Sequence, residues 1–263
     1  MLNRPLITII TVVYNGVKTL EQTIQSVLKQ TYSNIEYIII DGESTDGTLD
    51  IIKKYEDRIS LWISEPDKGL YDAMNKGISK ANGVIIGMIN CDDWYEINAV
   101  ELIVYNFQQH SEKKIFHGNR FDVKADGSKS IRRFNPSKFK FLYYGMTYNH
   151  PSMFIHKDIY NLNKYNPNLL SHSDYEFVLR QFLKNKNVFH FIDKAYVNYR
   201  LCGISSQITV WRSTIEVFKA RKNSGLSTYA AFFSLILSSI SELKLFLLST
   251  SKLFIHRFLF PIM

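Results

Sequence analysis

The chain has 263 residues, of which 46% are hydrophobic and 21% are charged, and this balance excludes a chain that is disordered throughout. A formal net charge of +8 at pH 7 leaves nucleic acid, an anionic membrane surface and an anionic small substrate as partners to consider. The cysteines Cys91 and Cys202 have neither metal-ligand spacing nor the pattern of a disulfide framework, which suits a reducing compartment. Because the N-terminus enters a strand pattern at once, without a signal-like segment, we expect a cytoplasmic protein.

The first part of the sequence alternates apolar, β-branched runs with amphipathic stretches. Strand patterns cover residues 6–13, 35–40, 59–64 and 84–89, and helical patterns cover residues 20–28, 48–55 and 71–80. This repeated order of strand, turn and helix predicts a parallel sheet with helices on both faces. Polar loops begin directly after the strands, at Tyr14, Asp41, Glu65 and Asn90. We expect these loops to meet at one edge of the sheet, where α/β proteins bind ligands.

Asp92 and Asp93 set two carboxylates side by side directly after an apolar strand. Such charges repel each other, and their burial costs free energy unless a cation offsets them. A hard divalent cation such as Mn²⁺ or Mg²⁺, bridged to phosphate oxygens, meets that need. The alternative is an exposed acidic turn in which Asp93 caps the next helix. The position after a strand favours the metal site.

Four motifs in a fixed order resemble those of a known family. They are ITIITVVYNG, IIIDGESTDGT, SEPDKGLYDAMNKGI and GMINCDDWY, and the resemblance, to family 2 glycosyltransferases, covers about residues 5–205. It implies an α/β fold of GT-A (Rossmann-like) type, with a mostly parallel central sheet flanked by helices and a C-terminal helical extension. It also implies a catalytic domain over residues 1–210, with a nucleotide-sugar half up to about residue 95 and an acceptor half beyond it, followed by a helical tail over residues 211–263.

On the donor side, the resemblance implies that Thr11, Val13 and Tyr14 line the nucleoside pocket. An aromatic face such as that of Tyr14 stacks well on a base, although Tyr14 is alternatively a rim aromatic that packs on the following helix. Asp41 matches the acid that accepts a hydrogen bond from the uracil imide, a donor that a carboxylate suits. The Asp-x-Asp metal signature begins here with Asn90, whose amide oxygen is neutral.

Metal and ribose binding therefore rest on Asp92 and Asp93, and the sequence leaves open which carboxylate holds the metal. The same resemblance implies donor contacts from Asp67, Lys68 and Asn75, which follow a pattern found in enzymes of bacterial surface polysaccharide synthesis. Many relatives carry an arginine where Met74 stands here, so Lys68 becomes the replacement cation near the diphosphate. The alternative for Lys68 is an exposed surface lysine.

The second half of the chain supplies the acceptor side. Asp174 opens an amphipathic helix and matches the family's catalytic base, which takes the proton of the acceptor hydroxyl in an inverting transfer. The alternative for Asp174 is an acid in the first turn that complements the helix dipole. His150 and His172 are candidates for contact with the acceptor or the donor phosphates, or are hydrogen-bonded structural residues. Arg200 and the residues after it resemble a loop that closes over the donor diphosphate.

The tail changes character, because residues 228–263 are rich in Phe, Leu, Ile and Ser. One interpretation is an amphipathic segment that lies on the inner face of the cell membrane, and the other is a helical hairpin packed on the catalytic domain or on a partner subunit, which allows a homo-oligomer. The apolar run at residues 230–240 is too short to span a bilayer comfortably. The basic residues form no aromatic-interleaved stripe, so we expect no nucleic acid partner.

Together these features indicate a metal-dependent inverting glycosyltransferase. Its expected donor is a UDP-hexose or UDP-N-acetylhexosamine, and its expected acceptor, implied by the resemblance, is a lipid-linked oligosaccharide for capsule, lipopolysaccharide or exopolysaccharide. One alternative is a transferase that uses a GDP- or dTDP-sugar. Another alternative is a module that binds a nucleotide sugar without catalysis. The asparagine at position 90, in place of the acid of the metal signature, would suit such a module.

Overall fold

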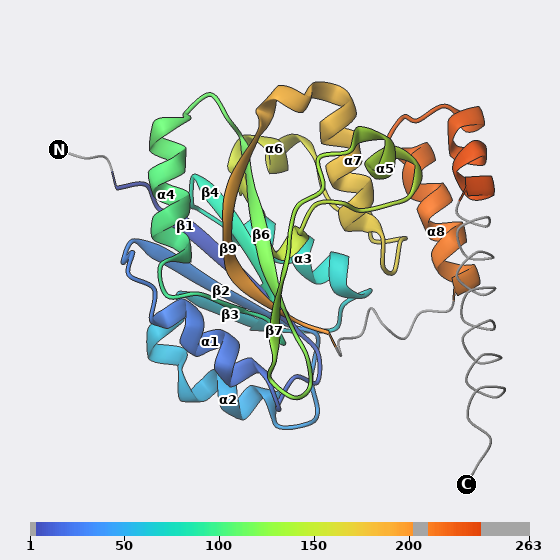
Figure 1. Ribbon diagram of the computed structural model, residues 1–263. Coiled ribbons are helices and arrows are strands. Elements are labelled where there is room, and N and C mark those ends of the chain that lie inside the picture. The colour runs from blue at the N-terminus through green and yellow to red at the C-terminus, as the bar shows by residue number, and fades with distance from the viewer. Residues whose placement is uncertain (1–3, 202–209, 238–263) are drawn as a thin grey trace, which may run out of the picture.

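The computed structural model describes residues 4–201 and 210–237, whose strands form one twisted sheet (Figure 1). The strands are β1 (Ile7–Val13), β2 (Ile35–Asp41), β3 (Leu61–Ser64), β4 (Ile85–Asn90), β5 (Trp94–Tyr95), β6 (Ile115–Val123), β7 (Lys129–Arg132), β8 (Phe154–His156) and β9 (Phe189–Arg200). Their order across the sheet is β3-β2-β1-β4-β8-β6-β9-β5, and β7 pairs with β6 outside this path.

Helices cover both faces of the sheet (Figure 1). They are α1 (Leu20–Leu28), α2 (Thr48–Lys54), α3 (Leu70–Lys80), α4 (Ala99–Gln109), α5 (Lys138–Tyr143), α6 (Lys157–Leu162), α7 (Ser173–Asn185) and α8 (Val210–Asn223), with short 3-10 turns η1 (Glu56–Arg58), η2 (His150–Ser152) and η3 (Lys186–Val188). Alternation along the strands feeds two cores: Ile7 and Ile9 pack with residues of α1, α2 and α4, whereas Ile10 and Val12 pack with residues of α3, α5, α6 and α7.

The predicted parallel half of the sheet is confirmed. β1 pairs in parallel with β2 and β4, and β2 pairs in parallel with β3. The second half is mixed, because β8 runs antiparallel to β4 and β6, and β9 pairs parallel to β6 but antiparallel to β5. The sheet is thus fully parallel from β3 to β4. The next strand, β8, is short and runs in the opposite direction to both of its neighbours, β4 and β6.

The described residues 210–237 pack against α5 and α7. Arg221 of α8 is fully buried and donates to the backbone carbonyl of Leu142 and to the hydroxyl of Ser234, which lies in the helical residues 228–237. Tyr143 and Phe233 meet edge to face, with ring centroids 5.7 Å apart. In residues 4–201 and 210–237 no helix combines the length and apolar character needed to cross a bilayer. Residues 238–263 lie outside the described residues.

Candidate active site

The four donor-side loops meet at one edge of the sheet, as the sequence predicts. In the strand register Val13 lies opposite Asp41, Asp41 opposite Ser64, and Val12 opposite Asn90, so the four strands end at nearly the same level. The backbone amide of Asn15 donates to the Ser44 hydroxyl (2.7 Å), which ties the loop after β1 to the loop after β2. Asn15 and Glu43 have positive φ angles of 52° and 64°, a conformation that non-glycine residues adopt infrequently and that concentrates at functional sites.

Tyr14, Gly42 and Asp67 come together from three of these loops. The ring of Tyr14 is 59% exposed, which leaves an aromatic face open at the edge of the sheet. A Cβ atom added at Gly42 would lie 2.5 Å from Asp67 Oδ2 and 3.4 Å from Tyr14 Cδ2. The absence of a side chain at Gly42 therefore lets the Asp67 carboxylate and the exposed Tyr14 ring both lie against the Gly42 backbone, so that an aromatic face and a carboxylate come together at this edge of the sheet.

Asp41 is fully buried at the end of β2, and both of its oxygens accept hydrogen bonds. Oδ1 accepts from the Ser44 hydroxyl (2.5 Å), and Oδ2 accepts from the Ser44 amide (3.0 Å) and the Ser64 hydroxyl (2.7 Å). The side chains of Thr11 and Val13 point into the sheet's core, where the Thr11 hydroxyl lies 3.0 Å from that of Tyr37. The structure thus places Tyr14 at the surface of the predicted pocket, and Thr11 and Val13 beneath it.

The paired aspartates differ in their surroundings. Asp93 is fully buried, and its Oδ1 accepts from the backbone amide of Arg200 (3.0 Å). Its Oδ2 is also buried and has no hydrogen-bond partner within the described ranges. Asp92 is partly exposed, and its backbone carbonyl accepts from Arg200 Nε (3.2 Å). Burial raises the pKa of Asp93 well above its usual value, and the neighbouring Asp92 carboxylate raises it further; burial also raises the pKa of Asp92.

This pair fits a hard divalent cation. A buried carboxylate oxygen without a partner is costly, and a cation offsets that cost while favouring the charged form of both acids. Within residues 4–201 and 210–237, no group of three or more His, Cys, Asp and Glu side chains is placed to hold a metal. Asp92 and Asp93 would therefore hold Mn²⁺ or Mg²⁺ together with oxygens from the ligand and from water, the coordination that Mg²⁺ usually has in proteins.

Asp174 is brought to this edge from the second half of the chain. It lies in the first turn of α7, and its Oδ1 accepts from the Tyr71 hydroxyl (3.2 Å), in the first turn of α3, and from the Tyr175 amide (2.8 Å). The ring of His150 meets the Tyr165 hydroxyl (2.9 Å) behind this contact, and burial lowers the pKa of His150. His150 is therefore a neutral hydrogen-bonding group at neutral pH, in the same polar cluster as the predicted base.

Comparison with known proteins decides which family this arrangement belongs to. The model of the family described as "Glycosyl transferase family 2" matches residues 8–193, well over half of the chain. The chain belongs to glycosyl transferase family 2.

Relatives and solved structures agree with this family. An uncharacterized glycosyltransferase of Haemophilus influenzae is 29% identical over 222 residues, which is 82% of this chain and 88% of that protein. The chondroitin synthase of Pasteurella multocida is 28% identical over 209 residues, and the match spans 78% of this chain but 21% of the synthase. Residues 1–349 of S. aureus TarS, solved in complex with UDP, superpose with a TM-score of 0.67 at 17% identity, covering 88% of this chain and 70% of that TarS fragment. That likeness shows a shared GT-A fold.

In this family 2 glycosyltransferase, three further residues that the sequence predicts to contact the nucleotide sugar lie just before α3 or within it. They are Asp67, Lys68 and Asn75. Asp67 Oδ1 accepts from the Gly69 amide (2.7 Å), and its Oδ2 faces Gly42. Lys68 has an exposed side chain beside them. The amide of Asn75 pairs in both directions with the backbone of Tyr165, at 2.8 and 3.0 Å, so in this structure it holds the acceptor half against α3.

Arg200 lies beside the aspartate pair. Its Nη2 donates to Gln22 Oε1 (2.9 Å), and its guanidinium stands over the Trp94 ring, 5.1 Å from the centroid. The residues that the sequence groups with Arg200 in a closing loop, 203–206, lie outside the described residues. The structure thus brings together Arg200, Asp92 and Asp93 on one side of the edge, and Tyr71 with Asp174 on another.

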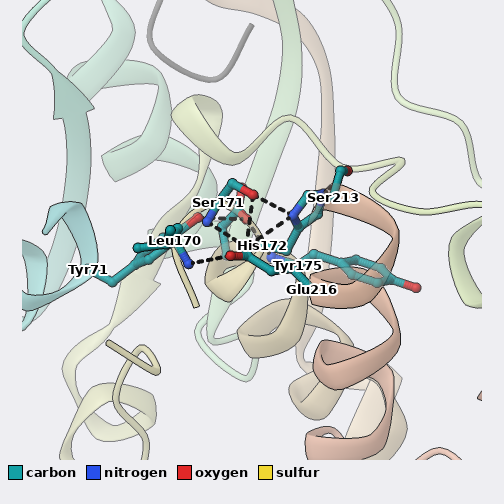
Figure 2. Close-up of polar contacts among 8 residues, drawn as sticks. Tyr71, Leu170, Ser171, His172, Tyr175, Ser213 and Glu216 are labelled. Atoms are coloured by element: carbon teal, nitrogen blue, oxygen red, sulfur yellow. Dashed lines mark hydrogen bonds and ion pairs between the residues drawn. The ribbon is translucent and has the colours of Figure 1, made fainter. Parts of the chain in front are cut away.

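Two residues of this site were missed by the sequence interpretation. Tyr71 stands inside the motif SEPDKGLYDAMNKGI, so the motif contains the signal, but its hydroxyl's partner is 103 positions away. Glu216 of α8 accepts hydrogen bonds from the loop that precedes Asp174, and Figure 2 shows it among Leu170, Ser171 and His172. No recognised motif surrounds Glu216, so the sequence offered no signal for it.

Proposed function

We propose that the enzyme moves a sugar from a UDP-hexose or UDP-N-acetylhexosamine to a lipid-linked saccharide, with inversion at the anomeric carbon. The observation that carries this proposal is the Tyr71–Asp174 contact, because it joins a carboxylate from the second half of the chain to the start of α3, directly after the loop that follows β3. A single-displacement transfer needs a base beside the acceptor and a charge-stabilising site beside the leaving group.

In the proposed reaction, Asp174 takes the proton of the acceptor hydroxyl as the hydroxyl oxygen attacks the anomeric carbon. The new glycosidic bond forms on the face opposite the bond to UDP, which breaks and leaves its electron pair on the diphosphate. A Mn²⁺ or Mg²⁺ ion held by Asp92 and Asp93 supplies charge neutralisation for that diphosphate when it is bound. The side chains of Lys68 and Arg200 add positive charge on the donor side.

Several findings support a pyrimidine donor and a metal. TarS has been solved with UDP and with UDP-GlcNAc, and a mannosyltransferase of Pyrobaculum calidifontis has been solved with GDP-Man and Mn²⁺. In this chain, Tyr14 offers an exposed aromatic face next to the Asp67 carboxylate, and Asp41 lies at the end of β2, directly before Gly42. A carboxylate at that position suits the imide of uracil or thymine.

The proposed acceptor and membrane association rest on relatives and on the tail. The relatives include a chondroitin synthase and a putative teichuronic acid biosynthesis glycosyltransferase. On the tail, Trp211, Tyr229, Phe232 and Phe233 are exposed by 76%, 90%, 59% and 47%. Exposed aromatic side chains of this kind suit the interface of a bilayer, so we place the enzyme at the inner face of the cell membrane.

The variant Phe232→Ser/Phe233→Ser should bind anionic vesicles less well than the wild type. If the variant instead loses a dimer that the wild type forms, the exposed aromatic side chains serve self-association.

The first experiment is calorimetric titration of UDP, GDP and dTDP, each with Mn²⁺ and with a chelator. We expect UDP to bind with Mn²⁺, and the variant Asp92→Ala/Asp93→Ala to lose that metal-dependent binding. Preferential binding of GDP would redirect the donor search to GDP-sugars. Absence of nucleotide binding by the wild type under both conditions would refute the proposed donor site.

A further inference from the structure

Helix α8 forms hydrogen bonds with the segment directly before the predicted base Asp174. The carboxylate of Glu216, whose side chain is 8% exposed, accepts from the Leu170 amide at Oε1 (3.1 Å). Its Oε2 accepts from the Ser171 amide and from the Ser171 hydroxyl, each at 2.9 Å. Three donors thus converge on one nearly buried carboxylate, and Figure 2 shows Leu170 and Ser171 pointing toward it. Although burial by itself raises the pKa of Glu216, hydrogen bonds from Ser171 and Leu170 hold it below its usual value.

His172 extends this network to the preceding turn of α8. Its Nδ1 lies 2.6 Å from the Ser171 hydroxyl and 3.6 Å from Glu216 Oε2, and its Nε2 lies 3.3 Å from the Ser213 hydroxyl. The Ser171 hydroxyl has one hydrogen and donates it to Glu216, so its oxygen accepts from Nδ1, which must carry hydrogen. His172 is therefore oriented toward α8, with both ring nitrogens engaged by serines (Figure 2).

A second anchor from the same helix holds the residue directly after the base. The fully buried Arg221 donates from Nε to the Tyr175 hydroxyl (3.2 Å) and to the Leu142 carbonyl (3.0 Å). The Tyr175 hydroxyl in turn donates to the Phe141 carbonyl (2.7 Å). Helix α8 therefore fixes the chain on both sides of Asp174.

We propose that Glu216 is a positioning residue for the transfer reaction: it holds Leu170 to His172 in one conformation and so fixes where the first turn of α7 presents Asp174. This inference rests on the proposed role of Asp174 as the base. Neither Glu216 nor Ser171 is placed at the acceptor or the donor, so their effect on turnover passes through the position of Asp174. A catalytic base that is displaced by about 1 Å loses much of its effect on the rate. Nucleotide binding at the loops after β1, β2, β3 and β4 does not depend on that displacement.

The test compares Glu216→Gln with a matched control directly after the end of the same helix, Ser224→Ala. Glutamine has the same shape but one acceptor oxygen, and its NH₂ group would face a backbone donor. The Ser224 hydroxyl lies within hydrogen-bond distance of two carbonyls, that of Glu176 in α7 (2.9 Å) and that of Ala220 in α8 (2.7 Å), and neither of these contacts involves residues 170–172. Each variant is measured for melting temperature, for UDP affinity with Mn²⁺, for kcat and donor KM by UDP release from the UDP-sugar that the wild type uses, and for amide exchange of residues 170–176.

We expect Glu216→Gln to lower kcat by about 10- to 100-fold with UDP affinity and donor KM unchanged, and to accelerate exchange at residues 170–176. Ser224→Ala should lower the melting temperature without a comparable loss of kcat. If Glu216→Gln does not fold, Ser171→Ala takes its place, since it removes one of the three donors and leaves the carboxylate intact.

A wild-type kcat in Glu216→Gln, or a loss of kcat that matches Ser224→Ala at equal loss of melting temperature, would overturn the inference. Both results presuppose an active wild type that Asp174→Asn inactivates. If the wild type releases UDP from no UDP-sugar, or if Asp174→Asn remains active, the proposed function itself has failed, and the positioning role fails with it.

Discussion

Tyr71 is the side chain through which the donor half of the enzyme reaches the predicted base. It is 4% exposed, and burial together with the Asp174 charge raises the pKa of its phenol well above the usual value, so the hydroxyl stays protonated and donates. This contact orients one carboxylate oxygen of Asp174. The ring of Tyr71 packs in the core against the ring of Tyr165, with the two ring centroids 5.8 Å apart.

The substitution Tyr71→Phe removes this hydrogen bond and keeps the ring. We expect kcat to fall about tenfold, equivalent to about 1.4 kcal/mol, because Asp174 loses a donor that orients it. Affinity for UDP with Mn²⁺ should stay within about twofold, since the hydroxyl is not part of the proposed donor site. Steady-state kinetics and calorimetry on the same protein check both numbers, and weakened UDP binding at unchanged kcat would contradict the assignment.

At the residue scale the sequence predicted identities better than partners. Motif positions singled out Asp92, Asp93 and Asp174, and the structure places the first two shortly after β4 and the third in contact with Tyr71 at the start of α3. The sequence did not predict that Asp93 is more buried than Asp92, because Asp93 is covered by a contact with Arg200, more than 100 positions later in the chain. Glu216 was out of reach for the same physical reason, since its function in the fold depends on contacts with a loop about 45 positions away.

At the scale of elements, the loops after β1, β2 and β3 bring together Tyr14, Gly42 and Asp67, the residues to which we assign the base of the donor. The loops approach closely at Gly42, since an added Cβ would lie 2.5 Å from Asp67 Oδ2. The side chain of Tyr14 provides an exposed aromatic face. The arrangement of these three residues therefore depends on a missing side chain as much as on those present.

The substitution Gly42→Ala should weaken UDP binding about tenfold, because the new methyl group displaces Asp67 and crowds the Tyr14 ring. Tyr14→Ala should weaken UDP by a similar factor through loss of stacking, which contributes about 1–3 kcal/mol per base at such sites. Tyr14→Phe keeps the aromatic face and is the control that should bind UDP normally. Calorimetric titration decides, and equal affinity in all three variants would place the nucleoside elsewhere.

The elements themselves were predictable where they are local. Helix α1 occupies Leu20–Leu28 as expected from its apolar spacing, and β1, β2 and β4 lie within one residue of the predicted runs. The second half was harder to predict, because β8 has 3 residues and β9 pairs with β6 through register shifts between Gly118 and Phe121. Pairing across such distances follows from tertiary packing, which no local period encodes.

At the scale of the whole molecule, a buried histidine outside the predicted site adds to the pH dependence of stability. His117 is 2% exposed inside a cage that includes Phe134, Tyr148 and Phe191, and its Nδ1 has no hydrogen-bond partner in the described part of the chain. Burial lowers the pKa of His117 to about 3, from an ordinary value of 6.5. The unfolded chain therefore binds a proton between these values that the folded protein does not.

The fold therefore keeps its full stability above pH 6.5 and loses up to about 1.4 kcal/mol per pH unit as the pH falls from there toward 3, because the unfolded chain takes up the proton. The variant His117→Phe keeps an aromatic ring in the cage and removes the titration. We expect its free energy of unfolding to fall less steeply than that of the wild type between pH 6.5 and 5. Urea denaturation at several pH values measures both slopes, and parallel slopes would show that His117 titrates normally.

The most direct test of the account is the substitution Asp174→Asn, measured for UDP release from UDP-hexoses and UDP-N-acetylhexosamines and for UDP binding in the presence of Mn²⁺. General-base catalysis contributes about 10²–10⁴-fold, so we predict that kcat falls by that factor while UDP affinity stays that of the wild type. Turnover at the wild-type rate would contradict the role of Asp174 and leave the base to be sought elsewhere in the acceptor half.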